Sequence, residues 1–180
     1  MKHTLWVAAI FTSLFLLLGC EKFKEKRFSS TIPYDIEIDL AEGESTTIDI
    51  TGQLSSMINK ELEKVKDNIK GYELVSIEYK IFEFWGATPN TFNGSIGFGN
   101  ANSTGSGTTY TFNDIDLQAG DDNPNRIKMS LNSQDIAKIQ QYFLDTNGLK
   151  LYLIGNTTET PVHFIMQVVV NIDAIAEVKN

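Results

Sequence analysis

The stretch PVHFIMQVVVNI, residues 161–172, carries the clearest structural pattern in the chain. Every second residue is apolar, as expected for a β-strand whose successive side chains point to opposite faces of a sheet. This apolar set comprises Val162, Phe164, Met166, Val168, Val170 and Ile172. Ile165 and Val169 add apolar side chains on the other face, which is typical of a strand covered on both sides. We therefore predict a central strand here, in a protein built mainly from β-sheet.

The same period of two recurs along most of the chain. It predicts further strands over residues 36–40, 48–50, 72–85, 92–98, 110–117, 127–131 and 149–155. Residues 41–44 have the length and the glycine of a hairpin turn, so the strands on either side of them are predicted to pair. The inward set of the 72–85 strand changes parity near Ile81, which indicates a β-bulge, and a second bulge is predicted at Asn113-Asp114.

Two segments have a helical period instead. In the first, apolar residues are spaced by four, four, three and four, which predicts an amphipathic helix ending before Gly71; they are Leu54, Ile58, Leu62, Val65 and Ile69. In the second, Asn132 or Ser133 is the expected N-cap, and Asn147-Gly148 is the expected end, with the glycine left-handed. The buried side of this second helix is Ile136, Ile139 and Phe143. Because the helices are inserted between strands and do not alternate with them, we predict an antiparallel β-sandwich of about eight strands.

The N-terminus has the parts of a secretory signal peptide. Lys2 lies in a polar head, and the apolar stretch over residues 5–18 is shorter than the ~20 residues of a transmembrane helix. The sequence that follows, Leu17-Leu18-Gly19-Cys20, resembles the lipobox of bacterial lipoproteins. The resemblance implies that the Cys20 thiol carries a diacylglycerol, that the chain is cut just before Cys20, and that the protein is held on a membrane through this lipid.

This resemblance suggests a division into a signal peptide (residues 1–19), a lipidated cysteine with a tether (20–31) and a single β-sandwich domain (32–180). The tether has no apolar periodicity and is expected either to be a solvated linker or, through its basic residues, to lie along anionic lipid headgroups. Glu21 replaces the Asp that retains enterobacterial lipoproteins in the inner membrane, which favours the outer membrane. The basic tether departs from the acid-rich surface signal of some Bacteroidota lipoproteins, so a periplasm-facing orientation is expected, with the cell surface as the alternative. In its general pattern the domain resembles small all-β envelope lipoproteins of Gram-negative bacteria.

Charge and composition exclude several classes of function. The 180 residues include 15 basic and 23 acidic side chains, for a formal net charge of -8. Such a surface repels phosphate backbones, so nucleic-acid binding is not expected. Cys20 is the only cysteine, which excludes an intrachain disulfide and a cysteine-based zinc cluster. We expect no cofactor.

Candidate partner-binding residues lie at a strand end and in two polar segments. Phe84 and Trp85 end the 72–85 strand, where an exposed tryptophan could stack on a sugar ring, although burial at the end of the core is the commoner outcome. A long loop over residues 100–108 contains Asn102. The segment 114–125 is acidic, through Asp114, Asp116, Asp121 and Asp122. Its spacing does not match an EF-hand, so we expect a polar turn and no metal site, and calcium binding stays an open alternative.

The sequence offers little to an enzyme. His163 is the only histidine that remains after cleavage, and it lies inside the predicted central strand, which favours a structural role over a catalytic one. Gly97 and Gly99 lack the third glycine and the helix of a phosphate-binding loop. We therefore expect no catalytic residue and predict a non-enzymatic binding or structural accessory module, with an envelope protein or a glycan as partner. The alternative is an envelope hydrolase that uses dispersed carboxylates.

Overall fold

The computed structural model describes residues 23–102 and 107–179. The signal peptide, the lipobox with Cys20 and the middle of the 100–108 loop lie outside this range, so the expectations about them stay predictions. Eight strands form in the described part: β1 (Phe23–Leu40), β2 (Thr47–Ser55), β3 (Ile69–Gly86), β4 (Thr91–Asn100), β5 (Thr108–Asp116), β6 (Ile127–Lys128), β7 (Gly148–Thr157) and β8 (Val162–Lys179).

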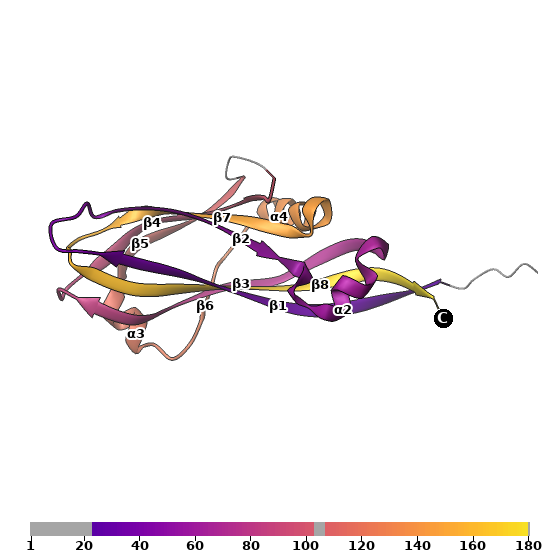
Figure 1. Ribbon diagram of the computed structural model, residues 1–180, viewed down its shortest axis with the longest axis horizontal. Coiled ribbons are helices and arrows are strands. Elements are labelled where there is room, and N and C mark those ends of the chain that lie inside the picture. Colours follow the sequence, from indigo (N-terminus) through magenta and orange to yellow (C-terminus); the bar gives the residue numbers. More distant parts are fainter. Residues whose placement is uncertain (1–22, 103–106, 180) are drawn as a thin grey trace, which may run out of the picture.

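The strands form two four-stranded sheets that face one another (Figure 1). Sheet A has the order β1-β8-β3-β6 and sheet B the order β2-β7-β4-β5, with antiparallel pairing in both. This order, in which all strands that are neighbours in sequence lie in opposite sheets except the paired β4 and β5, is that of an eight-stranded jelly roll. The predicted antiparallel sandwich is confirmed, and β8 lies between β1 and β3 as expected of a central strand.

The core lies between the inner faces of the two sheets. The inward set of β8 is fully buried from Val162 to Ala176. It packs with the inward residues of the other strands, among them Ile36, Ile38, Ile77, Tyr79, Ile81, Phe92, Ile96, Phe98, Phe112, Leu151 and Leu153. Each such side chain contributes ~1.5–3 kcal/mol through removal of apolar surface from water, so the period-two pattern is what drives the two sheets together. On the outer face of β8, Val169 is buried and Ile165 is half-buried.

The predicted hairpin between the first two strands is wrong. β1 pairs with β8 and β2 pairs with β7, so residues 41–46 cross from one sheet to the other. The buried sets of β1 and β2, Ile36 with Ile38 and Ile48 with Leu54, belong to opposite inner faces of the sandwich. A short turn can connect two strands of the same sheet as a hairpin, or two strands of facing sheets as an arch. The local sequence does not distinguish these two connections.

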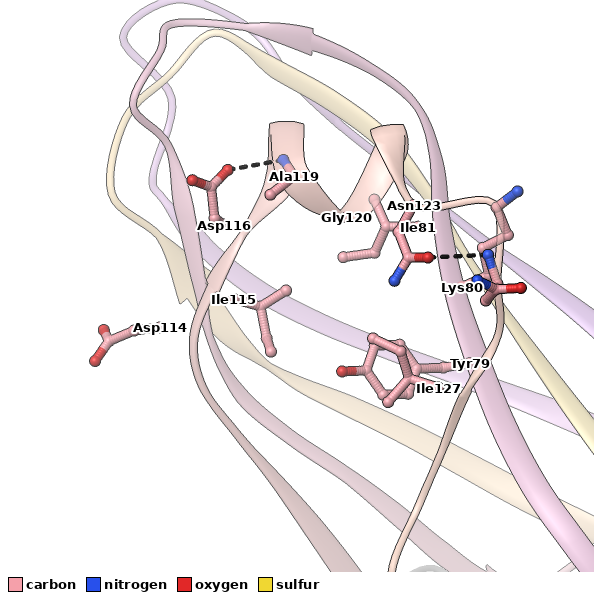
Figure 2. A pocket seen from close by; sticks show the side chains of 11 residues that line it. Tyr79, Lys80, Ile81, Asp114, Ile115, Asp116, Ala119, Gly120, Asn123 and Ile127 are labelled. Carbon is pink, nitrogen blue, oxygen red and sulfur yellow. Dashed lines mark hydrogen bonds between the residues drawn. The ribbon is translucent and has the colours of Figure 1, made fainter.

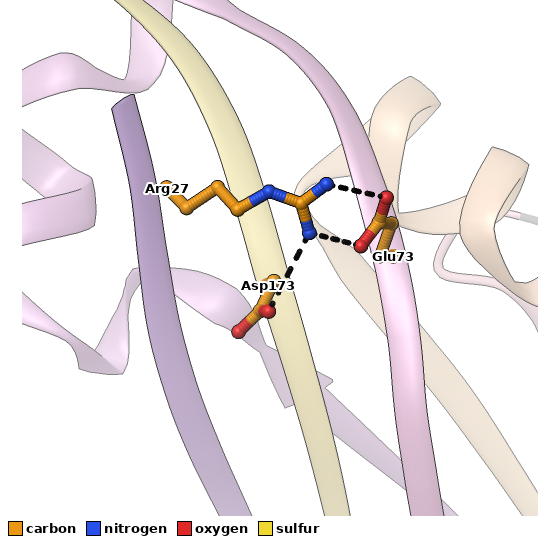
Figure 3. Close-up of polar contacts among 3 residues, drawn as sticks. All are labelled: Arg27, Glu73 and Asp173. Carbon is orange, nitrogen blue, oxygen red and sulfur yellow. Dashed lines mark hydrogen bonds and ion pairs between the residues drawn. The ribbon is translucent and has the colours of Figure 1, made fainter. Parts of the chain in front are cut away.

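The tether predicted for residues 20–31 is a strand from Phe23 onward. β1 pairs with β8 along its whole length, from Phe23 opposite Lys179 to Leu40 opposite Val162. Figure 3 shows how a side chain fastens this end: the Arg27 guanidinium, from β1, crosses β8 and binds the Glu73 carboxylate on β3 through both oxygens, with Asp173 3.8 Å away. Backbone pairing needs no apolar side chains, which is why a charged sequence gave no signal of a strand.

The first predicted helix is much shorter than the pattern suggested. Residues 54–69 contain α2 (Lys60–Val65) between two 3₁₀ turns, η1 (Ser56–Ile58) and η2 (Lys66–Asn68), while Leu54 belongs to β2 and Ile69 to β3. The helix begins where the Asn59 side chain accepts a hydrogen bond from the Glu61 N–H. The helical spacing therefore arose from residues of four different elements, β2, η1, α2 and β3, and one of them, Ile58, is exposed.

The second predicted helix is confirmed as α4 (Ser133–Thr146), with Asn132 as its N-cap and Ile139 and Phe143 buried. Its end differs in one detail, because Asn147 takes the left-handed conformation (φ 53°) and Gly148 is the first residue of β7. A further helix that the sequence did not predict, α3 (Leu117–Asp122), occupies the segment expected to be a polar turn.

Both predicted bulges are present. The pairing of β3 with β8 shifts between Phe82 and Trp85, where Glu83 has a positive φ of 58°. In β5, Asn113 and Asp114 lie opposite the single residue Asn93, and Asp114 has a φ of 48°. Each bulge redirects the side chains that follow it.

The two ends of the long molecule differ in what they carry (Figure 1). At the end called proximal below, β1 begins and β8 finishes. At the other, the distal end, lie the connections 41–46, 87–90 and 158–161, together with α3. Across residues 23–102 and 107–179, no helix combines the length and the hydropathy needed to cross a membrane.

Candidate functional site

Trp85 is presented on the outer face of sheet A at the distal end. Its side chain is 53% exposed, and its indole stacks on the imidazole of His163, with ring centroids 5.6 Å apart and planes 12° from parallel. The β3 bulge sets this orientation, since the strand re-pairs with β8 at Trp85 opposite His163. Phe84, by contrast, is half-buried and packs against the core. Of the two residues predicted at this strand end, only Trp85 can meet a partner, and the burial favoured for it is wrong.

The His163 imidazole packs against the face of the Trp85 indole. The histidine side chain is largely covered, and its Nδ1 lies 4.0 Å from the Asp39 carboxylate, which is exposed on β1. The ring face toward solvent is occupied by Trp85. This arrangement matches the structural role predicted for the histidine more closely than that of a base that must reach a substrate.

Asn90 makes the distal connections rigid. Its side chain is buried (1% exposed), and its Oδ1 accepts hydrogen bonds from the Thr158 N–H, the Thr158 hydroxyl and the Glu159 N–H at 3.0–3.3 Å. Its Nδ2 donates to the Glu159 carbonyl at 3.1 Å, and its own carbonyl accepts from the Leu117 N–H. One side chain thus joins the β3–β4 connection to the β7–β8 connection, while its backbone holds the start of α3.

A cleft of about 230 Å³ opens near the distal end between β3, the end of β5, α3 and the segment leading to β6 (Figure 2). Ile81, Ile115 and Ile127 give it an apolar lining. Lys80, Asn123 and Asn125 contribute polar groups at its rim, and Ala119 and Gly120 of α3 form one wall. The combination of apolar walls with a few polar groups is the general character of small-molecule sites, on a small scale.

The four predicted acids have separate tasks around this cleft. Asp116 caps α3, its carboxylate accepting a hydrogen bond from the Ala119 N–H at 3.0 Å. Asp114 exchanges two hydrogen bonds with Asn93 across the β5 bulge, and Figure 2 shows its carboxylate at the edge of the group. Asp122 accepts from Gln118 within α3, and Asp121 is half-buried. Asp114 and Asp116 line the cleft, whereas Asp121 and Asp122 do not.

Tyr79 brings a free hydroxyl to the cleft. The residue is only 3% exposed, and its ring packs edge-on against Phe112 at 5.1 Å. Within the described part of the chain, no group forms a hydrogen bond with its hydroxyl, which Figure 2 shows at the centre of the lining residues. Burial, with a smaller contribution from Tyr110, raises the pKa of Tyr79, so the hydroxyl stays protonated at neutral pH.

Asn102 lies apart from these residues. It follows β4, and its N–H bonds the Asn100 side chain at the end of the β4–β5 hairpin opposite to Asp116. The ten residues of β4 separate the two ends by about 30 Å. The loop and the acidic segment, both predicted to contribute to partner binding, therefore belong to different parts of the molecule.

No group of three or more His, Cys, Asp or Glu side chains that could hold a metal ion occurs in residues 23–102 and 107–179. The cleft was the feature that sequence reasoning missed. Tyr79 reads as an ordinary inward residue of a strand, and only the position of its hydroxyl at the cleft, without a hydrogen-bond partner among the described residues, distinguishes it.

No protein-family model and no curated protein matches the chain. Among solved structures, that of Desmodium yellow mottle tymovirus is 17% identical over 84% of both chains, with a TM-score of 0.35. Turnip yellow mosaic virus at 100 K is 14% identical over 86% of this chain and 97% of that one, with a TM-score of 0.33. Tobacco necrosis virus is 10% identical over 87% and 98%, with a TM-score of 0.35.

Proposed function

We propose that this protein is a lipid-anchored module of the bacterial envelope that binds a partner with its distal end and is not an enzyme. The observation that carries the proposal is the position of β1, which begins at Phe23, three residues after Cys20, and pairs with β8 along the whole molecule. A lipid on Cys20 is then attached almost directly to the proximal end. Asp39, beside His163 and Trp85, lies sixteen residues further along β1, so the indole is held about 50 Å from the anchor.

The distribution of charge supports the same orientation. Residues 23–31, 56–73 and 171–179, around the proximal end, contain eight basic and seven acidic side chains. The remaining described residues contain five basic and fifteen acidic ones. An anionic lipid surface attracts the nearly balanced proximal end and repels the acidic remainder. The field of the membrane therefore favours an upright protein.

The distal surface has the character of a binding site. A half-exposed tryptophan backed by a second ring offers a large rigid contact, and tryptophan is enriched among the residues that dominate binding energies. The connections beneath it are held by Asn90, so little order has to be gained on binding. An envelope protein or a glycan is the partner that we propose, and the outer membrane, facing the periplasm, is the proposed location.

The anchor is tested with Cys20→Ser. Serine cannot form the thioether, so metabolic labelling with a fatty acid should disappear and an uncleaved precursor should accumulate. Persistent labelling of the variant would refute lipidation at Cys20. Protease accessibility in intact cells, with a periplasmic protein as control, then separates a periplasm-facing domain from one on the cell surface.

The orientation is tested by tryptophan fluorescence in vesicles that contain lipids with a short-range quencher. Cleavage before Cys20 removes Trp6, so Trp85 becomes the only tryptophan of the anchored protein. Its emission should be quenched by iodide in solution and unaffected by the lipid quencher. The matched control is the double variant Trp85→Phe/Phe23→Trp, which moves the single indole to the exposed start of β1 and should be quenched by the lipids. Quenching of Trp85 by the lipids would contradict the upright arrangement.

The partner site is tested with a photo-crosslinking amino acid at position 85 in cells. We expect an adduct of defined mass that is absent when the same amino acid replaces Ala137, which is exposed on α4. Trp85→Ala should weaken recovery of that partner without loss of fold. Equal yields of the same adduct from positions 85 and 137 would show that the partner does not bind specifically at the distal end.

A further inference from the structure

The cleft beside α3 holds one group whose bonding the folded chain leaves incomplete. The Tyr79 hydroxyl is carried by a side chain that is almost wholly buried, yet no described residue bonds to it and it faces the cleft (Figure 2). Among the described residues no buried side-chain polar atom lacks a partner, so this hydroxyl is open to solvent through the cleft and can exchange hydrogen bonds with whatever occupies it. Water or a ligand hydroxyl can supply these hydrogen bonds.

The lining shows which kind of ligand fits. Ile81, Ile115 and Ile127 offer surface to C–H groups. The Asn125 amide offers a donor and an acceptor, and Asn123 offers its NH₂ group, because its Oδ1 already accepts a hydrogen bond from the Asn125 N–H at 3.0 Å. The cleft's volume of about 230 Å³ is below the ~300 Å³ at which sites for drug-sized molecules begin. A molecule of one ring that carries several hydroxyl groups matches both the size and the alternation of polar and apolar surface.

The charges around the cleft argue against an ionic ligand. The lining contains one cation, Lys80, and two carboxylates, Asp114 and Asp116, and the Asp116 carboxylate already accepts a hydrogen bond from the Ala119 N–H. Asp114 is likewise occupied, by Asn93. The rim thus carries both signs of charge, and neither forms a cluster that would select a phosphate or an amine.

We infer that this cleft binds a small neutral polyol, of the size of a single sugar ring, with the Tyr79 hydroxyl as a hydrogen-bond partner at its base. The inference goes beyond the proposed function, because it requires neither the lipid anchor nor Trp85. Trp85→Ala and Cys20→Ser should both leave this binding unchanged, so failure of one proposal does not imply failure of the other.

The test uses the full chain in micelles of a zwitterionic detergent, because detergents with sugar headgroups would compete. Saturation-transfer NMR and calorimetry are run with glucose, galactose, mannose and N-acetylglucosamine, and with glucuronate and glucosamine as charged comparators. We expect saturable binding of at least one neutral sugar. Tyr79→Phe should weaken it about two- to tenfold, the range for loss of one neutral hydrogen bond.

A second variant keeps the test decisive. Ala119→Leu extends an exposed α3 side chain into the cleft and should abolish binding, whereas Ala137→Leu makes the same change on the exposed face of α4 and should have no effect. Circular dichroism confirms that both fold; if Ala119→Leu does not, Tyr79→Phe decides alone. Absence of binding by all neutral sugars, preference for a charged comparator, or unchanged affinity in Tyr79→Phe would overturn the inference.

Discussion

Two buried tyrosines of β3 differ in what their hydroxyls contact, and replacing each with phenylalanine measures that difference. The Tyr72 hydroxyl donates to the Asn147 Oδ1 at 3.0 Å and lies 3.0 Å from the Ser56 Oγ. The Tyr79 hydroxyl has no partner among the described residues. Tyr72→Phe and Tyr79→Phe remove the same single oxygen from side chains that are 5% and 3% exposed. Any difference between them therefore reports hydrogen bonding and not burial.

The expected magnitudes follow from these contacts. Tyr72→Phe removes a partner from both Asn147 and the fully buried Ser56, which should lower the free energy of unfolding by about 1–3 kcal/mol. Tyr79→Phe should change it by less than about 0.5 kcal/mol, because its hydroxyl exchanges only contacts with solvent. For a domain of this size, 1 kcal/mol corresponds to a change in Tm of about 2–4 °C. We expect a fall of several degrees for Tyr72→Phe and almost none for Tyr79→Phe.

Urea unfolding followed by far-ultraviolet circular dichroism gives both free energies. The slope with denaturant should be the same in all three proteins, so that the midpoints compare directly. Ser56→Ala, alone and combined with Tyr72→Phe, completes a double-mutant cycle that isolates the coupling between the two hydroxyls. Equal destabilisation by the two Tyr→Phe variants would mean that Tyr79 is bonded in the free protein, which would refute the reasoning about the cleft.

Three further outcomes are expected. Asn90→Ala should lower the free energy of unfolding by about 2–3 kcal/mol in urea titrations, because several buried groups of the distal connections lose their partner; a loss under ~0.5 kcal/mol would contradict this. Arg27→Met should speed hydrogen exchange at the start of β1 and leave the Tm unchanged, since its pair with Glu73 is exposed; unchanged exchange would show that backbone pairing alone holds this end. Burial raises the pKa of Tyr72 and of Tyr79, so both hydroxyls bind protons more tightly in the folded than in the unfolded state. The stability that they contribute is fully present below about pH 10 and is lost as the pH rises above it, so absorbance at 295 nm should show two tyrosines that ionise at higher pH in the folded protein than in the urea-unfolded protein.

Much of the fold could be predicted from local sequence. The alternation in residues 161–172 predicted a central strand. A period of two is that of a β-strand, and additional apolar residues on the second face indicate a strand that is covered on both sides. Asn132 gave the start of α4, because a cap is made within one turn of the chain. The bulge at Asn113-Asp114 could also be read from the change of parity, since one extra residue moves every later side chain to the other face.

The candidate site could be predicted only in part. Trp85 was identified as a candidate, but its exposure depends on the Glu83 bulge and on His163 of a strand 78 residues further along the chain. Asn102 and Asp116 were both candidates, but they lie at opposite ends of the β4–β5 hairpin, so they do not form one surface. Tyr79 was taken as core, because no local pattern shows that a hydroxyl will lack a partner.

The sequence by itself determined most of the strands and the helix α4 with its cap, the buried face of the central strand β8, and that the surface is strongly acidic. These are properties of neighbours along the chain, where side-chain spacing and capping act within a few residues. Only the tertiary structure decided that β1 pairs with β8, that residues 23–31 belong to the sheet, and that a cleft opens beside α3. The strand pairing depends on backbone hydrogen bonds between segments more than 100 residues apart, and the cleft depends on the space left between packed elements. Neither can be predicted from the side-chain pattern of a single segment.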